Sequence, residues 1–234
     1  MKNTKLQTKI KLLNEQMQLE QQDMNSIIRK LKKISEECKR KFDESVDMVI
    51  AFEIKKKNDV IVRGTCNLPE GHGKKVKLLV FAEGKLGEVA REAGADLVGG
   101  IDLIEQLKNG EIKDKFHRCI AVESIMPQLM KNAQFLNSKR LMPNTKDSTI
   151  IKDNEDVLAN IVENIKSKTV FFKKDKPGYV RASVGKVSFS ENQLIKNATT
   201  LLNTVQSFNK NTKGKFITTV HFSTTMGPSI KLAF

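Results

Sequence analysis

Hydrophobic residues recur at helical spacing near the start of the chain and at strand spacing in the runs that follow. Between Met24 and Phe42, most apolar positions fall three or four residues apart, which predicts an amphipathic helix. Two runs rich in β-branched residues, 46–52 and 59–65, predict a strand pair joined by a charged loop at 55–58. The apolar stripe of the predicted helix consists of Ile27, Ile28, Leu31, Ile34 and Cys38.

The end of the chain has a similar mixture of strands and one helix. Strand-like runs lie at 169–172, 179–187, 216–222 and 229–232. Between them, Ser190 is a predicted helix N-cap, followed by the apolar stripe Leu194, Ala198, Leu201, Leu202 and Val205. This mixture predicts an α+β arrangement in which helices pack against an antiparallel sheet.

The middle of the chain alternates more regularly between the two kinds of element. Strands are predicted at 76–82, 96–99 and 117–122, and helices at 86–93, 101–107 and 125–136. Strand–helix alternation of this kind predicts a small parallel sheet with right-handed crossovers.

Charge divides the chain into three parts. Residues 1–72 carry fifteen basic and eleven acidic side chains, residues 73–165 carry fourteen of each, and residues 166–234 have a net charge of +10. A neutral insert between two basic flanks predicts a discontinuous domain of residues 1–72 and 166–234, and an insert domain of residues 73–165. The predicted crossings are the turn 69–73 and the polar stretch 164–168.

The overall composition narrows the class of partner. A net charge of +14 and a pI near 9.6 indicate a polyanion, either nucleic acid or an anionic membrane surface. No apolar run approaches the roughly 18 residues that a membrane span requires. Residues 1–22 lack the features of a signal or transit peptide and are expected to be mature sequence. Three widely separated cysteines are typical of a reducing compartment and not of a disulfide scaffold.

The turn Thr224-Thr225-Met226-Gly227-Pro228 lies between two strand runs in the most basic part of the chain. Phosphates are attracted by such a positive field, and hydroxyls, a soft apolar side chain and a glycine permit close contact with riboses. A simple hairpin turn is the alternative, but such a turn rarely requires a methionine. The pattern therefore predicts RNA contacts at Thr225, Met226 and Gly227.

Three motifs that suggest catalysis or cofactor binding fail on spacing. The segment 71–75 lacks the Ser/Thr and the spacing of a phosphate-binding P-loop, and 84–87 lacks the glycine spacing of a dinucleotide site. The histidines His72, His117 and His221 have no metal-ligand spacing. The sequence therefore predicts no enzyme, no cofactor and no metal. A nucleotide-dependent enzyme is the alternative, and a generic basic protein that coats nucleic acid or membrane is a third reading.

Six blocks of sequence, in order, resemble the bacterial-type large-subunit ribosomal protein L-one family, from about Ile34 to the end of the chain. The blocks are Lys41-Phe42-Asp43-Glu44-Ser45-Val46; Val62-Arg63-Gly64-Thr65 with Leu68-Pro69; Ala93-Gly94-Ala95-Asp96; Leu141-Met142-Pro143-Asn144; Gly185-Lys186-Val187-Ser188-Phe189; and Thr224-Thr225-Met226-Gly227-Pro228.

The resemblance implies a two-domain fold, with an rRNA-binding domain built from both termini and a Rossmann-like insert on a hinge. It implies binding to large-subunit rRNA beside other ribosomal components, formation of the mobile stalk beside the exit site, and release of deacylated exit-site tRNA. In bacteria it also implies repression of the protein's own mRNA. The corresponding location is the ribosome, in the bacterial cytoplasm or in an organelle.

The resemblance also assigns roles to individual residues. Phe42 is either a core aromatic or an RNA contact, and the family pattern favours RNA. Further RNA contacts are expected at Lys41, Glu44, Ser45, Arg181 and Lys186, although Arg181 and Lys186 could each be a solvated surface charge. Hinge positions are expected at Gly71 and Gly73, with ordinary turn glycines as the alternative. The chain departs from the family at three places. Asn137-Ser138-Lys139-Arg140 replaces the usual Gly-Pro-Arg-Gly, Thr145 replaces Pro, and Arg181 stands where His is common.

Overall fold

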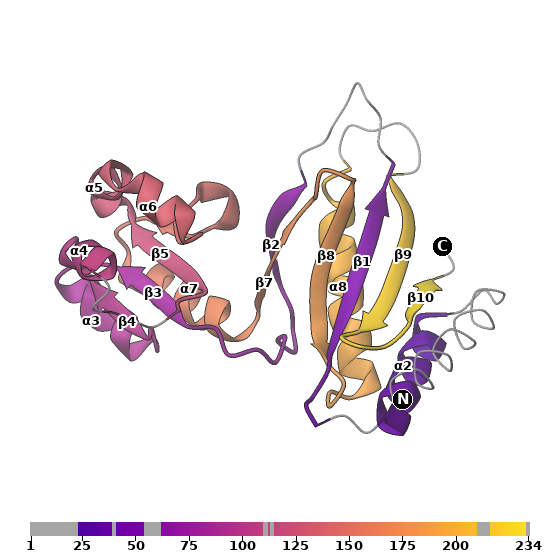
Figure 1. Ribbon diagram of the computed structural model, residues 1–234. Helices are drawn as coiled ribbons and strands as arrows, with labels where there is room; N and C mark the ends of the chain where they lie inside the picture. The colour runs from indigo at the N-terminus through magenta and orange to yellow at the C-terminus, as the bar shows by residue number, and fades with distance from the viewer. Residues whose placement is uncertain are drawn as a thin grey trace. The chain divides into compact units, whose positions relative to one another are not determined.

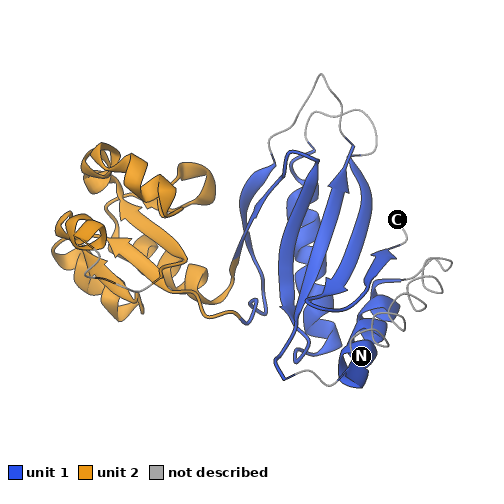
Figure 2. Ribbon diagram, in the orientation of Figure 1, with its two compact units in different colours: residues 1–73, 170–234 blue, residues 74–169 orange. Residues whose placement is uncertain are grey.

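The computed structural model describes residues 23–38, 41–53, 62–109, 112, 115–209 and 216–232 of the 234-residue chain. They form two compact units (Figure 2): unit 1 comprises residues 1–73 and 170–234, and unit 2 comprises residues 74–169. The predicted loop 55–58, the start of the predicted strand 59–65, and residues 1–22 lie outside the described part.

A four-stranded antiparallel sheet forms the centre of unit 1, in the order β10-β9-β1-β8. Its strands are β1 (Ser45–Phe52), β8 (Tyr179–Lys186), β9 (Ile217–Thr224) and β10 (Ser229–Leu232). β1 comes from the N-terminal part of the chain and pairs with two strands of the C-terminal part. This arrangement confirms the predicted antiparallel sheet built from both ends of the chain.

Two helices, α2 (Met24–Cys38) and α8 (Glu191–Gln206), supply the apolar cover of this sheet. Every second residue of β1 is buried, which is the pattern of a strand with one covered face. Figure 1 shows α8 behind the sheet and β8, β1 and β9 in front of it. The helix predicted to reach Phe42 is described only as far as Cys38. A separate pair of strands, β2 (Arg63–Asn67) and β7 (Thr169–Lys173), forms a small second sheet.

Unit 2 contains a parallel sheet in the order β4-β3-β5-β6. The central strand β3 (Leu78–Phe81) is buried at every position, which is typical of a parallel strand covered on both faces. The remaining strands are β4 (Leu97–Gly99), β5 (Arg118–Val122) and β6 (Ile150–Ile151), and the helices are α3 (Lys85–Glu92), α4 (Asp102–Asn109), α5 (Met126–Lys131), α6 (Ala133–Ser138) and α7 (Glu155–Ser167). The predicted parallel α/β insert is therefore confirmed.

The helices of unit 2 differ from the sequence prediction at two places. Helix α7 was missed, although Asn154 caps its first turn by accepting a hydrogen bond from the backbone N of Asp156 at 3.2 Å. The stretch 164–168, predicted as a domain crossing, contains the last turn of α7, and the division between the two units follows directly after it, between Thr169 and Val170. The single helix predicted at 125–136 is divided at Asn132, whose φ of −108° and ψ of 17° end α5 before α6 begins.

Candidate nucleic-acid interface

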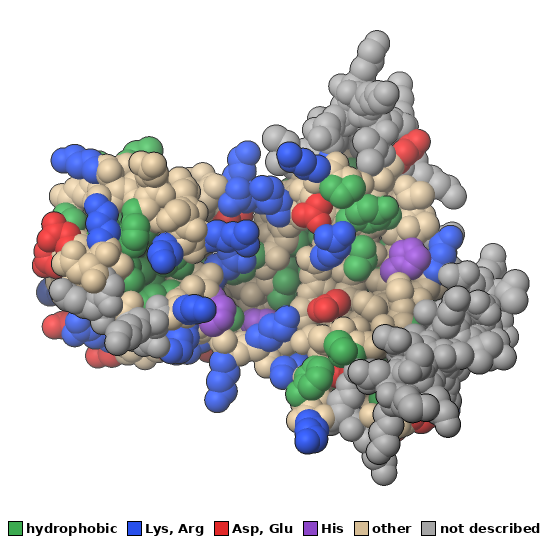
Figure 3. All heavy atoms as spheres, in the orientation of Figure 1, with side chains coloured by type: hydrophobic (Ala, Val, Ile, Leu, Met, Phe, Trp, Pro, Cys, Tyr) green, Lys and Arg blue, Asp and Glu red, His purple; other side chains and the backbone are tan. Residues whose placement is uncertain are grey.

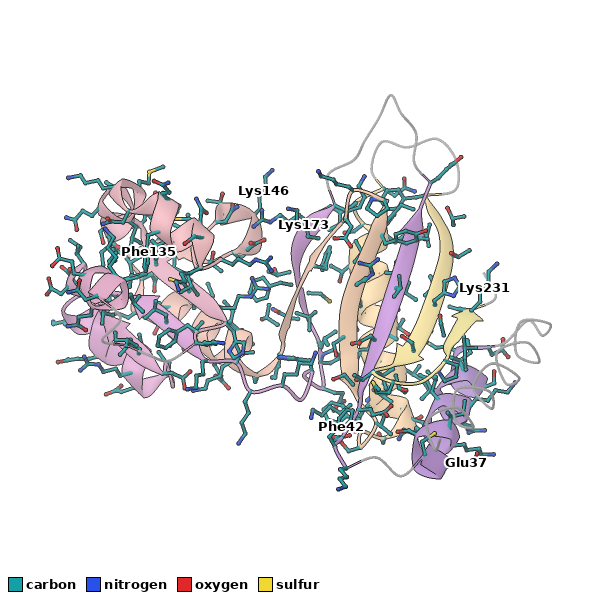
Figure 4. The ribbon with its side chains drawn as sticks, viewed as in Figure 1. Glu37, Phe42, Phe135, Lys146, Lys173 and Lys231 are labelled. Carbon is teal, nitrogen blue, oxygen red and sulfur yellow. The ribbon has the colours of Figure 1, made fainter. Side chains whose placement is uncertain are left out.

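Three segments that are far apart in the sequence meet at one end of the unit 1 sheet. Because the strands are antiparallel, the start of β1 lies beside the ends of β8 and β9: Ser45 pairs with Lys186, and Val46 pairs with Thr224. We call residues 41–45, 186–189 and 224–227 the interface end. Figure 4 labels Phe42 at this end of unit 1.

Hydrogen bonds join the three segments of the interface end. The backbone N of Thr225 donates to Ser45 O at 3.1 Å, and the backbone N of Ser45 donates to Thr225 Oγ1 at 3.0 Å. The backbone N of Val187 donates to Glu44 O at 2.9 Å. The side chain of Asp43 accepts hydrogen bonds from Ser188. The sequence-predicted residues Lys41, Phe42, Ser45, Lys186, Thr225, Met226 and Gly227 are thus brought together.

Two large apolar side chains are exposed at the interface end. Phe42 is 54% exposed and Met226 is 56% exposed, although residues of this kind are usually buried. The interpretation of Phe42 as a core aromatic was therefore wrong. In Figure 3, hydrophobic side chains lie beside Lys and Arg side chains at the lower end of unit 1. Flat or soft apolar groups next to cations suit a surface that contacts both bases and phosphates.

Gly227 is required by packing within the turn. A Cβ atom at this position would overlap Oγ1 of Thr224, a residue that is only 4% exposed. The turn is closed by the backbone N of Gly227, which donates to Thr224 O at 3.2 Å. The glycine therefore has a structural reason that is independent of any RNA contact.

Glu44 and Arg181 do not lie where the sequence analysis expected. Glu44 is 1% exposed, so its carboxylate faces the interior and does not fit a direct RNA contact. Arg181 pairs with Val49, four residues along β1 from Ser45, or about 13 Å from the interface end. There its guanidinium pairs with Asp175 at 2.7 Å and lies 5.8 Å from the centre of the Tyr179 ring. Arg181 therefore belongs to the middle of the sheet.

The two predicted hinge glycines both have positive φ angles, 71° at Gly71 and 69° at Gly73. Gly71 is held by Asn197 of α8, whose Nδ2 donates to Gly71 O at 2.8 Å and to Val184 O at 2.9 Å. The backbone N of Glu70 donates to Asn197 Oδ1 at 3.2 Å. A Cβ at Gly73 would lie 3.1 Å from Lys186 Cγ and 3.2 Å from Phe189 Cζ. Gly73 is thus in close contact with the interface end.

Sequence reasoning missed Asn197 and Asp43. Asn197 is fully buried, and its signal was a polar residue on the apolar stripe of α8, between Leu194 and Ala198. Asp43 had no such signal, because acids just before a strand are common on protein surfaces and the adjacent Glu44 looks the same in the sequence.

His221 lies on the other face of the sheet from α8, opposite Lys231 of β10. Burial and the nearby Lys231 ammonium both lower the pKa of His221 below its ordinary value of 6.5. Among the described residues, no three His, Cys, Asp or Glu side chains gather in a way that could hold a metal ion. None of the described helices has the length and apolarity needed to cross a membrane.

Comparison with known proteins shows the family of the chain. The model of the ribosomal protein L1p/L10e family matches residues 31–228, which include all six blocks noted in the sequence. The chain belongs to this family. Large ribosomal subunit protein uL1 of Persephonella marina (strain DSM 14350 / EX-H1) is 39% identical over 204 residues, which cover 86% of this chain and 82% of the relative. The family resemblance inferred from the six blocks is confirmed.

The departure from the usual family sequence before Leu141 has a visible structural consequence. Arg140 has a φ of 59°, in the left-handed region that favours glycine, and the resemblance places a glycine there in most members. It follows the C-cap Lys139 of α6, and the backbone N of Leu141 donates to Leu136 O at 2.9 Å. This is the position at which a helix commonly ends with a left-handed glycine.

Proposed function

We propose that this protein is a structural constituent of the large ribosomal subunit that binds large-subunit rRNA through the interface end of unit 1. The observation that carries the proposal is the convergence of 41–45, 186–189 and 224–227, with Phe42 and Met226 exposed among cations. Family membership supports the ribosomal assignment, and the net charge of +10 in residues 166–234 supports a polyanionic partner.

The residues of the interface end take distinct roles in this proposal. Lys41 and Lys186 neutralise phosphates, which supplies affinity without reading RNA structure. Phe42 and Met226 pack against bases or riboses, and Ser45 and Thr225 offer polar groups to a 2′-OH. Glu44 supports the surface from inside and makes no direct contact in this proposal.

The finer roles of the family follow from this anchorage. With unit 1 on rRNA, the proposal places unit 2 in the mobile stalk beside the exit site, where its movement assists release of deacylated tRNA. Gly71 and Gly73 absorb the backbone rotation, because a few loop positions that can change φ and ψ commonly carry domain motion and glycine is the least restricted residue. The same interface end represses the protein's own mRNA where that message presents a similar fold. The ribosome in question is in a bacterial cytoplasm or in an organelle.

The alternative of a nucleotide-dependent enzyme receives no specific support. The glycine that made 84–87 resemble a cofactor loop is explained by packing, because a Cβ at Gly87 would lie 3.2 Å from Ala82 O. Proteins of the ribosomal L1p/L10e family are structural, which favours the rRNA-binding proposal.

The test separates the effect of charge from the effect of close contact. Lys186→Ala should weaken binding to every RNA alike and lower the slope of log affinity against log salt by about one. Met226→Ala should cost on the order of 1–3 kcal/mol on structured stalk rRNA, with an unchanged salt slope and unchanged binding to unstructured RNA. Gly227 is unsuitable for this test because any side chain there would collide with Thr224.

Matched controls are available in unit 2. Met130 is an exposed methionine of α5, and Lys131 is an exposed lysine of the same helix. Met130→Ala and Lys131→Ala should leave rRNA affinity unchanged in filter-binding measurements. Unaltered binding of stalk rRNA by Met226→Ala would reduce the Thr-Met-Gly turn to a plain hairpin and reject the proposed interface.

The proposal also confines rRNA binding to unit 1. Residues 1–73 joined to 170–234 by a short linker should retain most of the affinity. Residues 74–169 alone should bind weakly, because sixteen basic and fourteen acidic side chains give them a net charge of only +2. Equal affinity of the two fragments for stalk rRNA would contradict it.

A further inference from the structure

Asp43 is an acidic residue in the middle of the proposed interface end. Its Oδ2 accepts a hydrogen bond from Ser188 Oγ at 2.8 Å, and its Oδ1 accepts one from the backbone N of Ser188 at 3.3 Å. Oδ2 also lies 3.7 Å from Lys186 Nζ. The carboxylate therefore ties the segment of Phe42 to the loop 186–189.

Simple electrostatics makes this position unfavourable for binding RNA. A carboxylate beside a surface that binds a polyanion repels phosphates, and here it also neutralises part of the charge of Lys186. If only the field mattered, removal of Asp43 would strengthen RNA binding. The geometry indicates a compensating role, because both hydrogen-bond donors of Ser188 are directed to this one side chain.

The loop 186–189, which Asp43 holds, also contacts three other residues of unit 1: Gly73, Lys32 and Glu44. The stem of Lys186 and the ring of Phe189 lie against Gly73, and Lys32 of α2 donates a hydrogen bond to Phe189 O. The backbone N of Val187 is bonded to Glu44 O, next to Asp43 in the chain. Asp43 is the side chain that fixes the exposed part of this loop, at Ser188, relative to Phe42.

We propose that Asp43 is a positioning residue that sets the specificity of the RNA interface. It weakens the attraction for RNA in general, and through Ser188 it fixes the position of Phe42 relative to the loop 186–189, which a folded rRNA site recognises. Specificity is a difference between two affinities, so a group that lowers nonspecific binding and preserves specific binding increases it. This inference rests on the proposed rRNA-binding function of the same surface.

Two substitutions separate the charge of Asp43 from its hydrogen bonds. Asp43→Asn removes the charge, but its amide oxygen and NH₂ group can still bond the backbone N and the hydroxyl of Ser188. Asp43→Ala removes both the charge and the bonds. The measurement is the ratio of the affinity for stalk rRNA to the affinity for unstructured RNA of equal length, by filter binding of the full chain over a salt series.

The two substitutions should change the affinity for stalk rRNA in opposite directions. Asp43→Ala should bind unstructured RNA more tightly and stalk rRNA more weakly, so that the ratio falls by about tenfold. Asp43→Asn should bind both RNAs more tightly and keep the ratio near that of the wild type. Asp175→Ala is the control, because it removes an ion-paired acid from the turn before β8, outside the interface end, and should leave the ratio unchanged.

The results that would reject the role of Asp43 differ from those that would reject rRNA binding itself. An Asp43→Ala variant with the wild-type ratio, or with tighter binding to stalk rRNA, makes Asp43 an ordinary surface acid. A wild-type chain with no preference for stalk rRNA rejects the rRNA function itself, and this inference with it. If Asp43→Ala does not fold, Ser188→Ala removes one of the same bonds from the other side and should lower the ratio less, and an unchanged ratio there overturns the proposal.

Discussion

The interface end of unit 1 and the loop 144–149 of unit 2 differ in the sequence separation of the residues that are hydrogen-bonded to each other. In unit 1, Ser45 and Thr225 are bonded to each other across a separation of 180 residues. In unit 2, the backbone N of Lys146 donates to Asn144 Oδ1 and Asn144 N donates to Thr149 Oγ1, all within one short loop. A surface assembled from distant segments depends on bonds between elements, whereas a local loop depends on its own turn chemistry.

The largest expected effect comes from breaking a long-range link of unit 1. Asn197→Ala should destabilise unit 1 by about 3 kcal/mol, because it leaves the carbonyls of Gly71 and Val184 and the backbone N of Glu70 without this partner in a buried site. The chain has one tyrosine and no tryptophan, and Tyr179 lies in unit 1. Denaturant unfolding followed by tyrosine fluorescence therefore reports on unit 1 alone.

The control for Asn197 is Asn203, an exposed residue of the same helix. Asn203→Ala should be neutral or slightly stabilising, since alanine has the higher helix propensity. A loss in Asn197→Ala no larger than in Asn203→Ala would mean that the link between α8 and Gly71 does not stabilise unit 1.

A smaller effect is expected at the predicted hinge, where Gly73→Ala forces a side chain into a φ of 69° and against Lys186 and Phe189. We expect a loss of about 1 kcal/mol in unit 1 and a narrower distribution of interdomain distances in single-molecule measurements. Gly84→Ala is the matched control, because Gly84 has a φ of 61° with nothing within 4 Å of a Cβ. Identical distance distributions in Gly73→Ala and wild type would contradict the hinge assignment.

In unit 2, a substitution that affects only local backbone conformation should improve stability. Arg140→Gly should stabilise this unit by up to about 1 kcal/mol, because glycine adopts the left-handed conformation of Arg140 without strain. Circular dichroism should show the gain, and tyrosine fluorescence from unit 1 should not. Lys139→Gly, one residue earlier at a φ of −85°, should instead destabilise. Equal changes in stability in Arg140→Gly and Lys139→Gly would show that the left-handed conformation of Arg140 does not destabilise unit 2.

Sequence patterns predicted the elements better than the site, for a physical reason. Hydrophobic periodicity records which side of an element is buried, so β10 was predicted with its observed bounds, and β1 nearly so. The pattern does not distinguish Asp43 from Glu44, two adjacent acids before a strand, yet one is exposed and the other buried. Helix α7 was missed because its polar end was interpreted as a crossing, although Leu158, Val162 and Ile165 follow helical spacing.

The hydrophobic pattern also could not predict which residues lie beside each other across the sheet, because it does not contain the pairing of the strands. Alternation along β8 predicts that Arg181 is exposed, but only the register with β1 places it opposite Val49 and away from Ser45. Family resemblance brought the right segments together, and the pairing of strands then decided which of their side chains share a surface.

The smallest expected effect concerns pH and the face of the unit 1 sheet that points away from α8. The folded protein lowers the pKa of His221 below 6.5, so in the window just below pH 6.5 the unfolded chain binds more protons at this residue than the folded chain does. The contribution of His221 to stability is therefore complete above pH 6.5 and is lost as the pH falls through the folded pKa. Unfolding of unit 1, followed at Tyr179, should show this decline, and His221→Gln should remove it.

Burial and the Lys231 ammonium both lower the pKa of His221, and a substitution of Lys231 separates their effects. Lys231→Met removes the ammonium opposite the imidazole but keeps an apolar stem, so the pKa of His221 should rise part of the way toward 6.5. NMR titration can follow this ring directly, because the chain has only three histidines and His221→Gln identifies its signal. An imidazole that titrates at or above 6.5 in the folded wild type would show that neither burial nor Lys231 governs this face of the sheet.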